Sequence, residues 1–110
     1  MIIRIGEARI REAGNMSISN YVTKETSKGF SLAVVALRGL HGKVRSSVSD
    51  RGYYILQGRA NVFVGDESSE VSVGDAVFIP AGTWHAIEGD VKYCVINSPA
   101  FDPKFEETFG

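Results

Sequence analysis

Short apolar and β-branched runs, separated by turn residues, dominate the hydrophobic pattern of this chain. Residues 31–37 are almost continuously apolar, which is typical of a strand buried on both faces. Residues 59–64 and 70–73 alternate between apolar and polar side chains, which is typical of strands with one face in the core. The same strand-like composition recurs at residues 52–58, 76–79, 85–87 and 93–96. The pattern therefore predicts strands along most of the chain.

Turn signals between these runs recur about every 8–12 residues, which favours an all-β sandwich or barrel. Both ends look like additions to that barrel. The N-terminal segment 1–12 is rich in isoleucine, so we expect an outer strand that stays on its own barrel or crosses to a partner subunit. Segment 102–108 begins with Asp102 at a helix N-cap position and Pro103 at the first helical position, which predicts a short C-terminal helix.

Length and composition fit one domain over residues 1–110, with a core barrel over about 32–98. The net charge of −1 gives no reason to expect a nucleic acid or membrane partner. No apolar run is long enough for a membrane span, and no signal peptide is evident at the start. The lone cysteine, Cys94, is expected to be a core residue in a reducing cytoplasm, and we predict a cytoplasmic protein.

The segment Gly74–His85 carries the clearest motif. An apolar run enters a Pro-x-Gly turn at Pro80 and Gly82, and His85 opens the return strand. This resembles the second motif of the cupin superfamily, Gly-x5-Pro-x-Gly-x2-His-x3-Asn, with Gly89 in place of the asparagine. The resemblance, which covers roughly residues 32–98, implies a double-stranded β-helix or jelly-roll barrel and a homodimer.

The first cupin motif fits in spacing, because Gly39 and Gly58 fall on its glycines. Where the family has the metal ligands His, His and Glu, this chain has Arg45, Ser47 and Arg51. Arginine stays protonated and cannot donate a lone pair to a metal. With His85 alone surviving of the ligand set that the resemblance implies, we expect no metal and no cofactor.

Strand parity extends the predicted site. If position 51 faces the interior, as the motif's Glu does, then Tyr53 and Gln57 share that face, and so do Arg45 and Ser47 across the preceding turn. A strand bulge would break this parity, and the alternative is that the arginines point to solvent.

Two further side chains near this site have open interpretations. Trp84 either seals the barrel mouth or stacks on a ligand. We interpret His41 as a loop residue, although His41-Gly42-Lys43 imitates part of the family's His-x-His.

These residues support two hypotheses of different class. The first is a metal-independent protein that binds a small organic anion in the barrel, held by the guanidinium groups of Arg45 and Arg51. The second is a metal-independent enzyme similar to the sugar isomerases and epimerases of the cupin superfamily, with His85 as base and Tyr53 as acid. A metal-dependent enzyme is a third, less supported hypothesis, because the ligands are missing.

Overall fold

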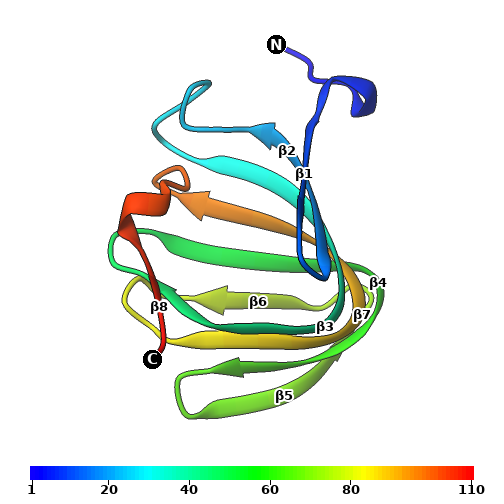
Figure 1. The fold of residues 1–110 in the computed structure, drawn as a ribbon, viewed down its shortest axis with the longest axis vertical. Helices are drawn as coiled ribbons and strands as arrows, with labels where there is room; N and C mark the ends of the chain where they lie inside the picture. The colour runs from blue at the N-terminus through cyan, green and yellow to red at the C-terminus, as the bar shows by residue number, and fades with distance from the viewer.

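The computed structural model describes residues 1–110 and consists almost entirely of antiparallel strands (Figure 1), as the sequence pattern predicts. The strands are β1 (Arg9–Ala13), β2 (Met16–Val22), β3 (Ser31–Ser46), β4 (Asp50–Val64), β5 (Glu67–Ser72), β6 (Ala76–Ile79), β7 (His85–Ser98) and β8 (Glu106–Thr108). Two 3-10 turns, Ile5–Glu7 and Pro103–Phe105, complete the secondary structure. The structure contains no helix with the length and hydropathy of a membrane span.

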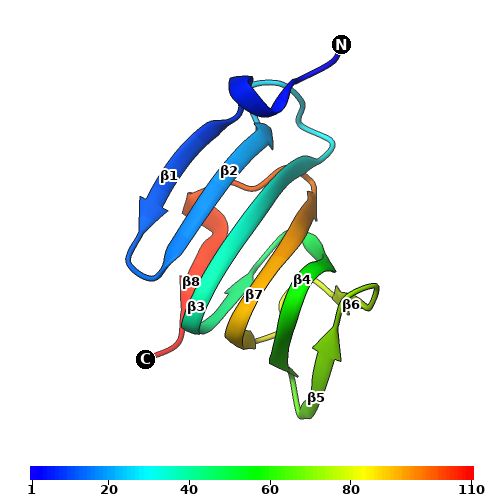
Figure 2. The same cartoon turned by 90° about the vertical axis from the view of Figure 1, so that its right-hand side faces the viewer.

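The strands form one strongly bent sheet in the order β1-β2-β3-β7-β4-β5, with β6 on β4 and β8 on β3. Figure 2 shows the first of these strands side by side, and Figure 1 shows the long strands curving around the interior. This is the jelly-roll arrangement expected of a small barrel, in which β3 and β7 form the central pair.

Three strands are longer than the sequence pattern predicts, and one of them, β7, joins the predicted runs 85–87 and 93–96. The predicted runs 52–58 and 59–64 merge into β4, and the run 31–37 continues as β3 to Ser46. Glycines allow these strands to bend without ending. Gly58 has a φ of +76°, and an added Cβ would collide with the Asp90 carbonyl oxygen of β7, while Gly39 and Gly89 face each other at the bend. Only glycine permits so close an approach between backbones.

Cross-strand rows place the core on the inner face of the sheet. The row Ser31–Asn97–Arg51–Ile79 lies beside the row Ala33–Val95–Tyr53–Val77, and both point inward. Deeper in the barrel, Leu37, Ile55, Ile87, Val91 and Tyr93 form a nearly fully buried core. Polar inner residues therefore collect at one end of the barrel and apolar ones at the other.

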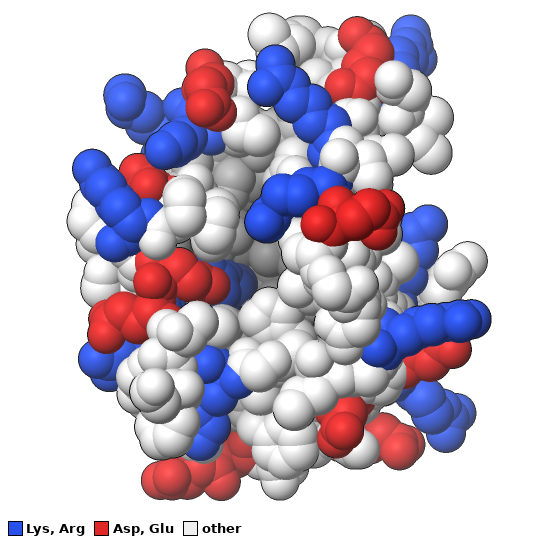
Figure 3. Space-filling model, in the orientation of Figure 1, with Lys and Arg blue, Asp and Glu red and all other residues white.

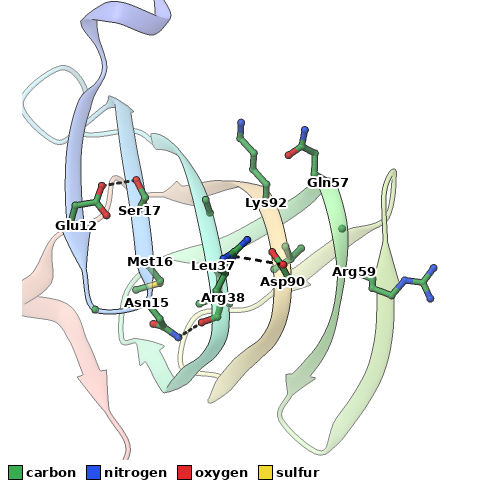
Figure 4. A pocket seen from close by; sticks show the side chains of 14 residues that line it. Glu12, Asn15, Met16, Ser17, Leu37, Arg38, Gln57, Arg59, Asp90 and Lys92 are labelled. Atoms are coloured by element: carbon green, nitrogen blue, oxygen red, sulfur yellow. Dashed lines mark hydrogen bonds and ion pairs between the residues drawn. The ribbon is translucent and has the colours of Figure 1, made fainter.

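The outer face of the same sheet is also divided. Two rows, Leu32–Ile96–Gly52–Phe78 and Val34–Cys94–Tyr54–Ala76, form a largely apolar surface that we call the outer apolar face. The next rows carry Lys92 and Gln57, then Arg38, Asp90 and Arg59. Figure 4 shows these polar side chains around an open groove of about 690 Å³.

The ends of the chain depart from prediction in detail. The predicted N-terminal strand over residues 1–12 is the turn Ile5–Glu7 followed by β1, which pairs with β2 of the same chain. At the C-terminus, Asp102 does cap a turn, since its Oδ1 accepts from the Lys104 backbone N–H at 3.1 Å. That turn ends at Phe105, and the rest of the predicted helix is β8 because the edge of β3 over Val44–Ser46 offers backbone partners.

Candidate functional site

A small cavity opens inside the barrel among β2, β3, β4, β7 and the C-terminal segment. Its volume is about 170 Å³, below the roughly 300–1,000 Å³ of pockets for drug-sized ligands. Figure 3 shows the hollow that enters this face, with charged groups around largely uncharged walls. The lining is mixed: Ile18, Val22, Val35, Val95 and Phe101 supply apolar wall, and Asn20, Arg51, Tyr53, Tyr93, Asn97 and Glu106 supply polar groups. A cavity of this size fits a compact molecule with apolar and polar parts.

Arg51 is the centre of the polar end. Only 6% of the residue is exposed, and its guanidinium is bound on several sides. Nε donates to Asn97 Oδ1 at 2.6 Å, and Nη1 donates to His85 Nε2 at 3.0 Å. Nη1 and Nη2 together hold the two carboxylate oxygens of Glu106, at 3.1 and 2.8 Å. Burial alone would lower the pKa of Arg51, but the hydrogen bonds and charge of Glu106 reverse this and raise it.

Each partner of Arg51 comes from a different element. Asn97 sits directly across from Arg51 in the pairing of β7 with β4. His85 is the first residue of β7, placed by the Pro-x-Gly turn that the sequence motif identifies. Glu106 opens β8 and pairs with Ser46 of β3. The cluster therefore ties the central strands to the C-terminal segment.

His85 is held as a neutral ring. Its Nδ1 lies 2.9 Å from the Thr83 carbonyl oxygen, which can only accept, so Nδ1 carries the proton and Nε2 accepts from Arg51. Burial lowers the pKa of His85, with the charge of Arg51 acting in the same direction. His85 stands behind Arg51 and does not line the cavity. Both ring nitrogens are thus committed, and this arrangement leaves His85 no free lone pair toward a ligand.

Two tyrosines form one wall of the cavity. The rings of Tyr53 and Tyr93 lie 4.8 Å apart between centroids, and Tyr53 also meets the His85 ring edge-on at 6.3 Å. Burial raises the pKa of Tyr53 to about 12 and raises that of Tyr93 as well. Both hydroxyl groups therefore stay protonated near neutral pH and can donate hydrogen bonds.

Four residues of the predicted site lie outside this cavity. Arg45 pairs with Glu107 at 3.1 Å and covers the Trp84 ring at 4.4 Å. Trp84 packs edge-on against Phe109, so it lies under the C-terminal segment. The remaining two are Ser47, whose hydroxyl reaches the Phe105 carbonyl oxygen, and Gln57, which lines the outer groove.

The parity argument is wrong for Arg45, Ser47 and Gln57 because both long strands contain irregularities. The register of β4 against β7 shifts between Ile55 and Gln57, which turns Gln57 to the outer face. In β3 the register shifts between His41 and Val44, so Ser46 rather than Arg45 points inward. Of the predicted set, Arg51 and Tyr53 share the cavity, and His85 supports Arg51 from behind.

The structure adds residues that the motifs did not indicate. Glu106 and Asn97 complete the hydrogen bonds of Arg51, and the Tyr93 ring packs at a tilt beside that of Tyr53. His41, predicted to be a loop residue, is part of β3 and lines the cavity. A buried arginine requires a counter-charge, which an internal acid or an anionic ligand could supply, and nothing in the sequence pointed to Glu106 as that acid.

This donor set does not fit a transition metal. First-row metals require three or four convergent His, Cys, Asp or Glu ligands. No group of three such side chains gathers anywhere in the structure. At the polar end of the cavity, the Arg51 guanidinium takes the lone pair of His85 Nε2 that a metal would need.

Comparison with known proteins places the chain in a family. The family model described as Cupin domain matches residues 42–96, and the chain belongs to this family. An uncharacterized protein of Streptomyces coelicolor is 29% identical over 100 residues, which cover 87% of this chain and 93% of that protein.

Solved structures confirm the fold. The nucleoside dehydratase Pac13 of Streptomyces has a TM-score of 0.90 at 15% identity, covering 99% of this chain and 90% of its own. KdgF from Halomonas sp. has a TM-score of 0.84 at 19% identity, covering 94% and 99%. Oxalate decarboxylase from Bacillus subtilis has a TM-score of 0.84 at 16% identity, and the match covers 96% of this chain but 31% of that one. Identities this low establish a shared fold alone.

The neutral state of His85 predicts how stability depends on pH. Its folded pKa lies below the ordinary value of 6.5, so its contribution is present above that value and is lost as the pH falls through the folded pKa. Between about pH 7 and pH 5.5 the free energy of unfolding should fall, by at most about 1.4 kcal/mol per pH unit for one proton. His85→Gln, whose amide oxygen can still accept from Arg51, should flatten this slope.

Urea unfolding of the parent and of His85→Gln at several pH values measures the effect. A His85→Gln protein with the full parent slope would show that another group controls stability in this range.

Proposed function

We propose that this protein binds a small polar organic molecule in the barrel cavity without a metal. The observation that carries the proposal is the composition of the cavity, with apolar and aromatic wall on one side and hydrogen-bonding groups fixed on rigid strands on the other. Tyr53 and Tyr93 offer protonated hydroxyl groups, and Glu106 offers carboxylate lone pairs. A ring-bearing molecule with hydroxyl or amide groups matches this lining.

The charge at the polar end of the cavity differs from the positive charge that Arg45 and Arg51, at the family's metal-ligand positions, suggested. Arg45 lies outside the cavity, and Glu106 neutralises Arg51. The other arginine of the lining, Arg11, lies on the exposed edge strand β1 at the mouth. The anion site expected from Arg45 and Arg51 is therefore replaced by one compensated ion pair inside the cavity and one solvated cation, Arg11, at its mouth.

A pair of substitutions on one strand tests cavity binding. Ala33 of β3 lines the cavity, and Ala36 of the same strand lies on the outer groove. Ala33→Phe should fill the cavity and abolish binding of small neutral ring compounds, whereas Ala36→Phe should bind like the parent. At ten times Kd a ligand stabilises the fold by RT ln 11, about 1.4 kcal/mol, which a thermal-shift assay detects.

The screen would begin with uridine, because variants of Pac13 with a histidine or a tyrosine replaced are solved with uridine. Chelator-treated protein should bind as well as untreated protein. Binding that survives Ala33→Phe, or that a chelator removes, would contradict the proposal.

A specific observation also favours a second function, a metal-independent acid–base enzyme. His41 lines the cavity, and its Nδ1 lies 2.9 Å from the Gly42 carbonyl oxygen, so Nδ1 carries the proton and Nε2 is left free to accept one. Tyr53 in the same cavity can act as the proton donor. His41 thus takes the role of base that the sequence hypothesis gave to His85.

Deuterium exchange tests this second function. The protein would be incubated in D2O with a neutral compound identified by the screen, and deuterium incorporation into the compound would be followed by NMR. His41→Gln should lower the exchange rate by about 100-fold or more, as expected for loss of a general base, with Kd changed less than threefold. Exchange that persists in His41→Gln, or is absent in the parent, would leave binding as the function.

We also propose that a second copy of the chain covers the outer apolar face. Phe78, Tyr54 and Ile96 are 66%, 51% and 45% exposed there, and monomers rarely expose so contiguous an apolar surface. The face lies opposite the cavity, so a two-fold related copy leaves the mouth open. The adjoining charged rows carry both signs, as the Arg38–Asp90 pair shows, which suits a self-complementary border.

Light scattering at micromolar concentration should give the dimer mass for the parent. Ile96→Glu places a charge inside the outer apolar face and should give the monomer mass. Lys92→Glu, on the same strand and the same side but in a polar row, should remain dimeric. A parent of monomer mass, or an Ile96→Glu protein that stays dimeric, would contradict the proposed dimer.

A further inference from the structure

The side of the Arg51 guanidinium that faces the cavity is already occupied by a carboxylate of the same chain. Glu106 binds both terminal nitrogens in a bidentate pair, at 3.1 and 2.8 Å. This is the geometry in which an arginine would bind the carboxylate or phosphate of a ligand. Both Arg51 and Glu106 line the cavity, so the pair is part of the binding wall.

Several contacts keep Glu106 in this position. β8 pairs with β3 through Ser46, Arg45 and Val44. The residues that follow Glu106 are fixed on the surface, since Glu107 pairs with Arg45 at 3.1 Å and the Phe109 ring packs on Trp84 at 5.2 Å. The Phe109 ring also lies 4.6 Å below the Lys43 ammonium group. These contacts fix the backbone of β8, so the Glu106 carboxylate is placed at the Arg51 guanidinium by the fold itself.

The charges around the cavity make entry of an anion unfavourable. Asn97 and His85 take further donors of Arg51, so the guanidinium has no open fork for a second carboxylate. An anion beside the pair would face the negative charge of Glu106. Arg11 at the mouth is exposed to solvent, where screening weakens its attraction.

We propose that Glu106 determines ligand specificity, by acting as a built-in counter-ion that reserves the cavity for uncharged molecules. The proposal rests on the cavity binding proposed above and names its ligand class: neutral ring compounds whose hydroxyl or amide groups donate to Glu106 and accept from the tyrosines. Removing the charge of Glu106 should convert the same cavity into an anion site, because the Arg51 fork then lacks its carboxylate.

Chemical rescue by formate tests the role of Glu106 without any organic ligand. Glu106→Gln keeps the shape of the side chain but leaves a buried guanidinium unpaired, so the variant should melt below the parent. Sodium formate supplies a carboxylate, and 100 mM formate against chloride at equal ionic strength should raise the melting temperature of Glu106→Gln by on the order of 5 °C.

Two controls accompany this measurement. Glu107→Gln removes the neighbouring charge outside the cavity and should show no formate effect beyond that of the parent. The double variant Arg51→Met with Glu106→Gln should lose the rescue. Formate that stabilises the parent equally, or that still rescues the double variant, would overturn the proposal.

Ligand selection is then measured with benzamide and benzoate, which share a shape and differ in charge. The parent should prefer benzamide, and Glu106→Gln should shift the ratio of the two Kd values at least tenfold toward benzoate. An unchanged ratio would overturn the specificity role even if benzamide binds. If neither compound nor any neutral compound of the screen binds the parent, cavity binding itself fails, whereas the formate result still decides whether Glu106 is the counter-ion.

Discussion

A buried guanidinium needs a counter-charge, and much of this structure depends on how Arg51 obtains one. Taking a single charge out of water is expensive unless a partner is buried with it, and removing one partner of such a pair costs about 3–5 kcal/mol. Here the partner is Glu106, which lies 55 residues away in sequence. The C-terminal segment is therefore more than a cover for the barrel, because its strand β8 carries the charge that allows Arg51 to remain inside. Asn97 and His85 complete the arrangement by accepting from the same group.

The bent strands explain why polar and apolar surfaces are so sharply separated. Close backbone approach at Gly58 and Gly89 lets β4 and β7 continue through the bend as paired strands. Between the register shifts at Ile55/Gln57 in β4 and His41/Val44 in β3, alternate residues of each long strand face the interior or the outside. The inner rows change from polar at Arg51 to apolar at Ile55, and the outer rows change from apolar at Ile96 to charged at Asp90. One sheet thus supplies both a candidate binding cavity and a candidate contact surface.

The sequence was informative where local chemistry determines structure. The Pro-x-Gly turn at Pro80 and Gly82 places His85 at the start of β7, and glycine spacing identifies the family. The prediction that Gln57 faces the interior was wrong because a one-residue register shift moves its side chain to the other face of the sheet. No feature of the local sequence indicates this shift. Glu106 was missed for a different reason. Segment 102–108 has genuine helix-start signals, but pairing with the free edge of β3 stabilises its second half as a strand.

The partner of one lone pair, on Nε2 of His85, distinguishes this chain from the metal-binding proteins whose motif it resembles. In the cupin motif that the sequence resembles, the histidine of the second motif is a metal ligand. Its Nε2 or Nδ1 would therefore face a metal cation that is also held by further histidines and an acid. In this chain, Nε2 of His85 faces a cation as well, but that cation is the Arg51 guanidinium, fixed by covalent attachment to β4. A guanidinium donates hydrogen bonds in a plane and has no vacant coordination position. The arginine at the ligand position therefore keeps a positive charge inside the barrel but replaces metal coordination with hydrogen bonding. Glu106 then determines how much of that positive charge a ligand can reach.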